Sequence, residues 1–559
     1  MTIMKSEVRQ GAYYDSVVLM QLQKALAELP GVADAGVVMA TDANKELLAA
    51  GDLLPADVNA KADDLLIVVK GETETAVTEA MSQVDDLLTR RKASGSGGGE
   101  YRPHSLAAAA KMLPEADWVL ISVPGRYAAG VAEEALDLGK HVFLYSDNVP
   151  LADEVRLKQK AQAKGLLLMG PDCGTAIVNG VGLGFANRVR RGRIGLVAAS
   201  GTGLQAVSSE IHNLGSGLSQ AIGTGGRDLK AEVGGITALQ AVDMLGKDPA
   251  TRVIALVSKP PSPKVATQLL RAAQATGKQI VVNFIGFPPP GHKVGNIHFA
   301  TSLVETAELA VHLATTVETS LLSPMRRTVE GYVRGLFSGG TLAYETVLGL
   351  TAVLDQLTTN IPIRPDQKLD DLNRSQGHTI IDMGEDEFTQ GRLHPMMDND
   401  LRLRRLRQET ADPAVGFILL DVVLGEGSHP NPAGELSPAI ADAVQAGKKV
   451  IAIVVGTDED PQDLNGQIEQ LAAAGATVFP STNEAVDYIF NRLPAPELSA
   501  PPVSAAAFGG KLAAINVGLE SFYESIKGQG GTAVQVEWRP PAGGNEKLMA
   551  ILAKMKQKD

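Results

Sequence analysis

The sequence predicts an α/β protein with tandem open parallel-sheet domains, Rossmann-like or flavodoxin-like, preceded by a small α+β domain. Short apolar runs of strand length repeatedly end in small-residue turns that lead into helix-compatible stretches. Glycine is abundant, with 58 residues, and aromatic residues make up only 4%, which is typical of tight strand-to-helix turns. A chain of 559 residues is too long for one hydrophobic core, so we expect several domains.

The N-terminal part is expected to contain two domains. Residues 1–93 alternate between helical and strand periods, which predicts a ferredoxin-like α+β domain. The segment SGSGGG that follows has the composition of a flexible linker. Residues 101–190 contain the apolar runs ADWVLISVP, KHVFLYSD and GLLLMGPDCG, typical of a parallel sheet buried on both faces. No glycine-rich opening turn precedes Ala116, so this Rossmann domain is expected to be incomplete.

The rest of the chain has the pattern of a repeat. Residues 191–318 and 329–495 pass through strands, turns and helices in the same order, so we predict a duplicated open α/β domain. Residues 508–559 predict a C-terminal βαβ arm.

An anion site is predicted at GLVAASGTGLQAV, which starts at Gly195. The turn after its strand would present unpaired N–H groups at the positive end of a helix dipole, where phosphate or carboxylate binds. An ordinary turn with Ser200 as N-cap is the alternative. The turn at 338–341 takes the same place in the second copy, and the two turns are expected to face each other across a phosphoryl group. The predicted phosphate-binding residues are Ser200, Gly201, Thr202, Gly203, Gly225, Gly226, Arg227, Ser338, Gly339, Gly340 and Thr341.

Two charged residues are expected to support this site. Lys259 would add positive charge and serve as a catalytic residue, and Asp228 could orient Arg227. The alternative for Arg227 and Asp228 is a local surface ion pair of little energetic value.

Composition excludes several classes of function. A net charge of −13 argues against a nucleic-acid partner. No apolar run reaches the length of a membrane helix, and the N-terminus lacks a secretory signal, so we expect a cytoplasmic protein without a membrane contact. Cys173 is the single cysteine, so no internal disulfide can form, and a small buried thiol is the expected state. No cofactor and no metal site are expected.

Several motifs resemble a known family. GPDCGTAIVNG, the Ser200 turn and GTGGRD are similar to the α subunit of succinyl-CoA synthetase, and the second copy is similar to the ligase domain of its β subunit. Over nearly the whole chain, MGPDCGT, VSKPP, GGTLA, LLDVVLG and WRPPAGGN resemble the FdrA family of bacterial proteins. The resemblance implies a succinyl-CoA synthetase-like fold with an incomplete CoA-binding-like domain. It implies either an NDP-forming acyl-CoA synthetase, or one subunit of an oxamate carbamoyltransferase of allantoin catabolism with two further subunits.

The residues favour the second activity. The resemblance implies a phosphohistidine in the synthetase, yet His292 lies in a proline-rich turn and His298 in an apolar run, and Lys259 stands near the place of the supporting glutamate. Phosphorolysis of oxalurate to oxamate and carbamoyl phosphate needs only a site that holds small anions and stabilises an oxyanion. His394, with Asp398 nearby, is the candidate general acid or base, although a structural histidine before proline is the alternative. The synthetase and a non-catalytic scaffold subunit remain alternative functions.

Overall fold

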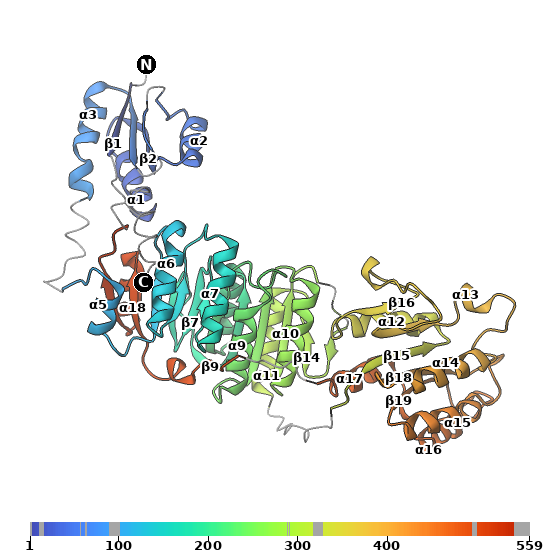
Figure 1. Cartoon of the computed structure of the whole chain (residues 1–559). Coiled ribbons are helices and arrows are strands. Elements are labelled where there is room, and N and C mark those ends of the chain that lie inside the picture. Colours follow the sequence, from blue (N-terminus) through green and yellow to red (C-terminus); the bar gives the residue numbers. More distant parts are fainter. Residues whose placement is uncertain are drawn as a thin grey trace, which may run out of the picture. The chain divides into compact units, whose positions relative to one another are not determined.

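The computed structural model describes residues 3–9, 16–55, 58–61, 64–88, 101–287, 289, 291–316, 328–494 and 500–540. The predicted linker at 94–99 and the end of the predicted arm, 541–559, lie outside them. The chain forms two compact units, one made of residues 1–140, 146–148 and 513–559, and the other of residues 141–145 and 149–512. The elements of both are α/β, which confirms the predicted class (Figure 1).

The first unit begins with a small α+β module. Its elements are β1 (Ile3–Arg9), α1 (Ser16–Ala27), β2 (Val32–Met39), α2 (Asp42–Ala50), β3 (Leu65–Gly71) and α3 (Glu74–Ser82). The antiparallel sheet has the order β1-β3-β2. Alternate residues of the central strand β3 enter two different apolar clusters, Ile67 in one and Val68 in the other. Because successive side chains of a strand point to opposite faces, both faces of this sheet are covered, and the predicted small α+β domain is confirmed.

The first unit also contains a parallel sheet made from both ends of the chain. Its elements are α5 (Leu106–Met112), β4 (Trp118–Ile121), α6 (Gly125–Asp137), β21 (Ala513–Val517), α18 (Glu520–Gly528) and β22 (Thr532–Val536). β21 pairs with β22 on one side and with β4 on the other, with Ile515 opposite Val119. The expected βαβ segment is therefore present, but it shares a sheet with β4. Local patterns cannot predict this, since hydrogen bonds join strands that are far apart in the sequence.

The turn after β21 lies close to the end of β4. Gly518 has φ +126°, and a Cβ there would lie 2.4 Å from Ser122 Oγ. The next residue, Leu519, donates its N–H to the same hydroxyl at 2.8 Å. A glycine is needed because the two strand ends approach each other closely.

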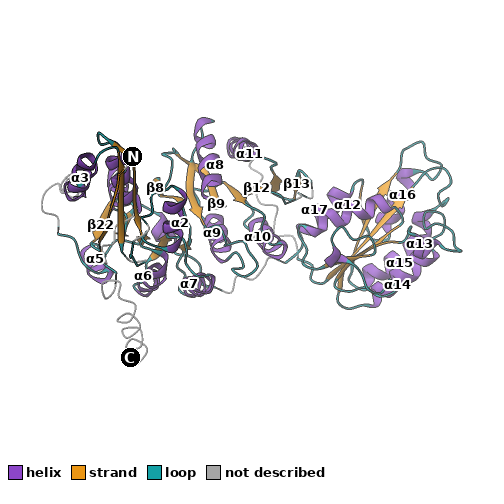
Figure 2. Ribbon diagram, turned by 90° about the horizontal axis from the view of Figure 1, so that it is seen from above, coloured by secondary structure: helices purple, strands orange, loops and turns teal. Residues whose placement is uncertain are grey.

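The second unit contains an eight-stranded sheet of order β13-β14-β12-β11-β9-β10-β7-β8. Its strands are β7 (Thr175–Val178), β8 (Val181–Gly184), β9 (Arg191–Ala199), β10 (Leu218–Gly223), β11 (Val253–Ser258), β12 (Gln279–Phe284), β13 (Lys293–Val294) and β14 (Ile297–Phe299). The helices after them are α8 (Gly201–Asn213), α9 (Ile236–Lys247), α10 (Pro263–Ala275) and α11 (Leu303–Thr315). β5 (His141–Leu144), α7 (Leu151–Ala163) and β6 (Leu168–Met169) precede this sheet, and β5 pairs with β6. Figure 2 shows helices on both sides of the strands.

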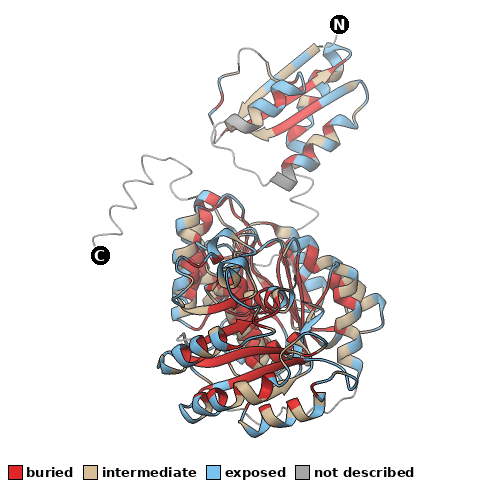
Figure 3. Ribbon diagram, turned by 90° about the vertical axis from the view of Figure 1, so that its right-hand side faces the viewer, coloured by how far each residue is buried: buried red, intermediate tan, exposed pale blue. Residues whose placement is uncertain are grey.

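The other sheet of this unit has six parallel strands in the order β16-β17-β15-β18-β19-β20. They are β15 (Tyr332–Phe337), β16 (Leu357–Thr359), β17 (His378–Asp382), β18 (Val415–Val423), β19 (Lys449–Val455) and β20 (Thr477–Phe479). The helices are α12 (Gly340–Thr351), α13 (Asp386–Thr389), α14 (Asp400–Ala411), α15 (Pro432–Gln445), α16 (Leu464–Ala473) and α17 (Thr482–Phe490), with short 3-10 turns at Pro365–Gln367 and Ala505–Phe508. Its strands are largely buried, as Figure 3 shows.

The strands that precede the two predicted turns occupy equivalent positions in their sheets. β9 lies between β10 and β11, and β15 lies between β17 and β18. In both sheets, strands that come later in the chain lie on either side of this strand, so the strand order reverses there. Ligands of open α/β sheets bind at such points, beyond the carboxyl ends of the strands. This places the two predicted turns, after β9 and after β15, at equivalent edges.

One buried histidine gives the second unit a predicted acid sensitivity. Burial lowers the pKa of His141 to about 4, and its Nδ1 accepts the N–H of Leu167 at 2.9 Å. The contribution of this neutral ring to the free energy of unfolding is complete above pH 6.5 and decreases as the pH falls from 6.5 to 4. In this range the histidine is protonated in the unfolded state but not in the folded state. His141→Asn should reduce the stability loss over this range by about 3 kcal/mol. Unfolding measured against pH tests this, and an unchanged profile in the exposed-site variant His292→Asn is the control.

Candidate anion-binding site

The turn after β9 forms the N-terminus of α8. β9 is buried from Ile194 to its end at Ala199, and Ser200 then takes an extended conformation with φ −156° and ψ 115°. The Ser200 hydroxyl accepts the N–H of Gly203 at 3.2 Å, so Ser200 is the N-cap of the helix. The N–H groups at Gly201 and Thr202 precede the first helical hydrogen bond, which Leu204 donates to Ser200. Ser200 therefore caps the helix, and the N–H groups of Gly201 and Thr202 make no intrahelical hydrogen bond.

A cavity of about 240 Å³ lies at this turn. Most of the residues that the sequence predicts at the first turn line it together, although they come from the ends of three strands. The lining residues are Asp172, Cys173, Gly174, Thr175, Ala198, Ala199, Ser200, Gly201, Thr202, Gly223, Gly225, Gly226 and Lys259. The carboxyl ends of β9, β10 and β11 therefore converge on one cavity.

The glycine-rich turn after β10 needs its glycines because the segment before β7 packs against it. A Cβ at Gly223 would lie 2.2 Å from the carbonyl oxygen of Thr175. Gly225 has φ +85°, and a Cβ there would lie 2.3 Å from the carbonyl oxygen of Pro171. Only glycine permits these backbone approaches. A Cβ at Gly201, in contrast, would make only ordinary contacts, at 3.7 Å from Thr175 Oγ1, so that position accepts a side chain without a backbone clash.

Among the residues that line the cavity, Lys259 has a charged side chain and Cys173 has an uncharged thiol. Lys259 follows β11 and is exposed, and no hydrogen bond or ion pair of its ammonium is found in the part of the chain that the structure describes. Cys173 is 2% exposed, and its thiol donates to the carbonyl oxygen of Thr175 at 3.6 Å. Burial raises the pKa of Cys173 to about 12, so the thiol is protonated at neutral pH and is a poor nucleophile. The expected small buried thiol is confirmed.

The Arg227 side chain binds a buried carboxylate and a carbonyl oxygen outside the cavity. Its Nε lies 2.8 Å from Oε2 of the fully buried Glu154, and Nη2 donates to the carbonyl oxygen of Val149 at 2.8 Å. Arg227 is not among the residues that line the cavity. This differs from the expected phosphate contact, since a buried carboxylate of α7 already binds the guanidinium.

Asp228 does not orient Arg227 either. Its Oδ1 accepts from Nζ of Lys158 at 2.6 Å, and Oδ2 accepts the N–H of Ala238 at 2.9 Å. Lys158 has no exposed side-chain surface and also lies 3.1 Å from Oε1 of Glu154. These charges form a buried network between α7 and the turn after β10, which the sequence did not predict. Lys158 also donates to the carbonyl oxygen of Thr224 at 2.9 Å, so the network contacts the residue before Gly225.

The turn after β15 is organised differently. Asp421 of β18 is fully buried, and its carboxylate accepts the N–H groups of Ser338 and Gly339, each at 2.7 Å, and the Ser338 hydroxyl at 3.0 Å. Arg402 lies 3.1 Å from Asp421 Oδ1. The chain therefore supplies its own anion to this turn, contrary to the expected second phosphate cradle at Ser338–Thr341. The cavity at Ser200 also contains no residue of this turn, so facing turns are not observed there.

His394 lies near this second turn. A Cβ placed on Gly384 would be 3.0 Å from His394 Nε2 and 3.1 Å from Asp382 Oδ1, so the carboxylate close to His394 is Asp382. The expected partner, Asp398, instead accepts the N–H of Asp400 at 3.0 Å at the start of α14. The sequence contains a signal for Asp382, since this carboxylate ends a buried strand, but His394 is separated from it by α13 and the turn that follows.

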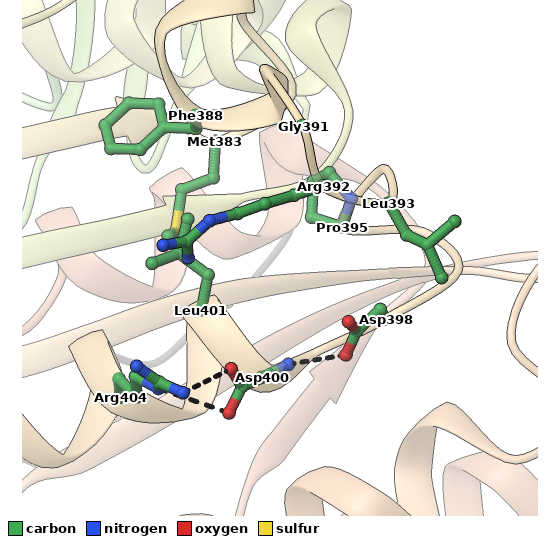
Figure 4. A pocket seen from close by; sticks show the side chains of 10 residues that line it. All are labelled: Met383, Phe388, Gly391, Arg392, Leu393, Pro395, Asp398, Asp400, Leu401 and Arg404. Carbon is green, nitrogen blue, oxygen red and sulfur yellow. Dashed lines mark hydrogen bonds and ion pairs between the residues drawn. The ribbon is translucent and has the colours of Figure 1, made fainter.

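A second hollow, of about 300 Å³, lies between the segment after β17 and α14 (Figure 4). Its lining residues are Met383, Phe388, Gly391, Arg392, Leu393, Pro395, Asp398, Asp400, Leu401 and Arg404. Arg404 pairs with Asp400 at 2.7 Å, and Arg392 extends toward Met383 and Leu401 in the view. Its charges are therefore partly balanced within the protein, unlike that of Lys259.

Neither histidine considered for a phosphohistidine lines the first cavity. His298 lies in β14 and contacts Gln279 Oε1 at 3.0 Å, and burial together with the charges of Lys293 and His312 lowers its pKa to about 4. It is a packed strand residue, as the sequence indicates. His292 is exposed in the preceding loop.

No helix in the described ranges is long and apolar enough to cross a membrane. Within the same ranges, no group of three or more histidine, cysteine, aspartate or glutamate side chains could hold a metal ion.

Three family models match parts of the chain. Residues 1–103 match the AllF, heavy metal-associated domain, residues 189–286 match a CoA binding domain, and residues 336–488 match a CoA-ligase model. The last two models cover the strands around the two turns described above. The first 103 residues contain neither cysteine nor histidine, so they lack the thiolate and imidazole ligands that heavy metals prefer.

Individual proteins are also similar. YahF of Escherichia coli (strain K12) is 41% identical over 497 residues, which are 86% of this chain and 96% of that protein. The succinate–CoA ligase [ADP-forming] subunit alpha of Aquifex aeolicus is 30% identical over 187 residues, which are 32% of this chain and 59% of the subunit. The apo structure of the dinucleotide-forming acetyl-coenzyme A synthetase 1 of Ca. Korarchaeum cryptofilum is 16% identical over 67% of this chain and 82% of that chain, with a TM-score of 0.28.

Proposed function

Since the chain belongs to the family of YahF, an FdrA-like family related to succinyl-CoA synthetase, we propose that it is an acyl-CoA synthetase-like subunit that transfers an acyl group to or from phosphate. The cavity at the N-terminus of α8 would hold the phosphate group. The observation that carries this proposal is the convergence of Gly201, Thr202, Gly225, Gly226 and Lys259 on one cavity.

The cavity has the chemistry that a phosphoryl group needs. Main-chain N–H groups at a helix N-terminus are fixed donors aligned with the helix dipole, and they stabilise oxyanions without reorganisation. Lys259 adds a full positive charge beside them, and the cavity volume of about 240 Å³ suits a small anion. In acyl transfer, the acceptor attacks the acyl carbon, the bond from this carbon to the phosphate oxygen breaks, and phosphate leaves with the electron pair. The donors around the cavity would stabilise that departing charge.

Transfer without a covalent enzyme intermediate agrees with this cavity. The thiol of Cys173 is protonated, and His292 and His298 are not among the lining residues. The acyl group would thus pass directly between phosphate and its acceptor.

The same observation favours a second candidate, oxamate carbamoyltransferase. Carbamoyl phosphate is an acyl phosphate, and phosphorolysis of oxalurate to oxamate and carbamoyl phosphate would need the same phosphate cradle and no nucleophilic residue. Two further subunits would supply the remainder of that active site. Two assays of the assembled complex distinguish the candidates. Acyl-CoA formation from an acyl phosphate would support the synthetase, and phosphate-dependent cleavage of oxalurate would support the carbamoyltransferase.

Lys259→Met tests the phosphate cradle without an assumed substrate. Loss of one charge at a partly solvated anion site should weaken binding of inorganic phosphate about tenfold. It should also lessen the dependence of binding on salt. Calorimetric titration of phosphate into the full chain measures both effects. Lys264→Met, at an exposed position in α10 outside the cavity, is the matched control. Equal phosphate binding by Lys259→Met and the wild-type chain would contradict the proposed role.

A further inference from the structure

A buried carboxylate lies at the carboxyl end of β17 in the six-stranded sheet. Asp382 is 2% exposed and ends the strand. Asn360 holds its backbone from both sides, because the side-chain oxygen accepts the N–H of Asp382 at 2.9 Å and the side-chain amide donates to its carbonyl oxygen at 2.8 Å. Gly384 donates its N–H to Asp382 Oδ1 at 2.8 Å. The Asn360 side chain thus holds the backbone of Asp382, and the Gly384 N–H orients its carboxylate.

His394 faces the same point as this carboxylate. Its Nδ1 accepts the N–H of Met396 at 3.2 Å, which assigns the ring proton of the neutral imidazole to Nε2. A Cβ on Gly384 would lie 3.0 Å from this Nε2, 3.1 Å from Asp382 Oδ1 and 2.9 Å from the carbonyl oxygen of Ser338. Three polar atoms from three segments therefore surround the space that the missing side chain of Gly384 leaves free.

The second oxygen of Asp382 lies at the N-terminus of α12, which is labelled in Figure 1. A Cβ on Gly340, the first residue of this helix, would be 2.7 Å from Asp382 Oδ2. Among the hydrogen bonds of the described residues, none involves Oδ2. The neighbouring Asp421 differs, because the turn after β15 and Arg402 occupy its carboxylate. Asp382 is thus the carboxylate at this edge with a free oxygen.

We propose that Asp382 is a general base in a second reaction centre, that His394 positions the acceptor there, and that this centre takes the N–H group of an uncharged or cationic acceptor such as an amine or a primary amide. In the proposed step, Asp382 Oδ2 removes a proton from the acceptor nitrogen. The lone pair of this nitrogen forms the new bond to the acyl carbon of an acyl phosphate, the bond from this carbon to the phosphate oxygen breaks, and phosphate leaves with the electron pair. His394 is a positioning residue, because its Nε2 borders the same space as Asp382 Oδ1.

The charges around Asp382 support an acceptor of this class. Burial raises the pKa of Asp382, and the negative charges of Glu385 and Asp421 raise it further, while the Gly384 N–H and His394 oppose the rise. A raised pKa makes a carboxylate a stronger base. The carboxylates of Asp382 and Asp421 would repel an anionic acceptor. An N–H donor, in contrast, finds hydrogen-bond acceptors in Asp382 and the carbonyl oxygen of Ser338. This site goes beyond the proposed phosphate cradle, which belongs to the other sheet.

Carbodiimide coupling with glycinamide tests the centre in the full chain, because glycinamide carries both an amine and a primary amide. We expect Asp382 to be labelled although it is buried, while the equally buried Asp421 is not, as read by mass spectrometry of the peptides. Gly384→Ala places a methyl group between the polar atoms and should abolish the labelling. An Asp382 that remains as inert as Asp421 would overturn the proposal. Labelling requires no catalytic activity, so this result is independent of phosphate binding at Lys259.

A kinetic experiment tests whether Asp382 acts as the base. With acetyl phosphate as donor and hydroxylamine as nitrogen acceptor, the isosteric variant Asp382→Asn should lower kcat about 100-fold or more in the assembled protein, with little change in KM for acetyl phosphate. His394→Gln should lower kcat less and should shift the pH dependence that Asp382 sets to higher pH, because His394 lowers the pKa of Asp382. Calorimetric phosphate binding by both variants should match the wild-type chain. An unchanged kcat in Asp382→Asn beside measurable wild-type turnover would exclude Asp382 as the base and leave the phosphate cradle unaffected.

Discussion

Gly201→Val should weaken phosphate binding about 100-fold while the fold stays intact. The position is the first residue of α8 and is exposed at the cavity. A Cβ there meets Thr175 Oγ1 at 3.7 Å and the Cα of Gly174 at 3.9 Å, which are ordinary contacts, so the backbone accepts the change. The isopropyl group would occupy the space in front of the N–H donors. Loss of two charge-assisted hydrogen bonds corresponds to about 3 kcal/mol, hence the expected factor.

Calorimetric titration with inorganic phosphate measures this effect, and thermal unfolding verifies the fold. Gly130→Val is the matched control, since a Cβ at Gly130 finds no heavy atom within 4 Å and the residue lies in α6, outside the cavity. Ser200→Ala should have a smaller effect, because it removes the N-cap hydroxyl and leaves the main-chain donors in place. Wild-type phosphate affinity in a folded Gly201→Val chain would show that the turn is architecture only.

Lys158→Met should destabilise the second unit by about 3–5 kcal/mol. The ammonium of Lys158 has no exposed surface, and it lies 3.1 Å from Glu154 Oε1 and 2.6 Å from Asp228 Oδ1. It also donates to the carbonyl oxygen of Thr224 at 2.9 Å. Its removal leaves buried carboxylates with less compensation, since Arg227 reaches only Glu154. The turn with Gly225 and Gly226 would lose its support, so phosphate binding should fall as well.

Urea unfolding of the full chain, followed by hydrogen exchange of the peptides around 154–238, measures this loss. Lys230→Met is the matched control, because Lys230 is exposed in the same turn region and should change stability little. The double variant Lys158→Met, Asp228→Asn should be more stable than Lys158→Met alone, since it removes one of the uncompensated charges. A stability equal to that of the wild-type chain in Lys158→Met would mean that water or rearrangement replaces the ammonium.

Local patterns in the sequence were sufficient for the α/β class and for the first cavity. The apolar run that ends at Ala199, the N-cap residue Ser200 and the small residues after it depend on neighbours within one turn of chain, so their structure follows from local chemistry. The strand ends of a parallel sheet meet at one edge, and this brought Gly225, Gly226 and Lys259 to the predicted turn. The buried state of Cys173 also followed from its residue type.

Tertiary structure alone decided which charges meet and which donors remain free. Arg227 and Asp228 are adjacent in sequence but bind Glu154 and Lys158 of another helix, because burial requires each charge to find a partner in space. Asp421 fills the second turn for the same reason, and Asp382 replaces Asp398 beside His394. The C-terminal strand β21 completes a sheet with β4, a pairing made across most of the chain. The sequence by itself determined the elements and the N-capped turn after β9, whereas long-range pairing of strands and charges determined which groups each turn contacts.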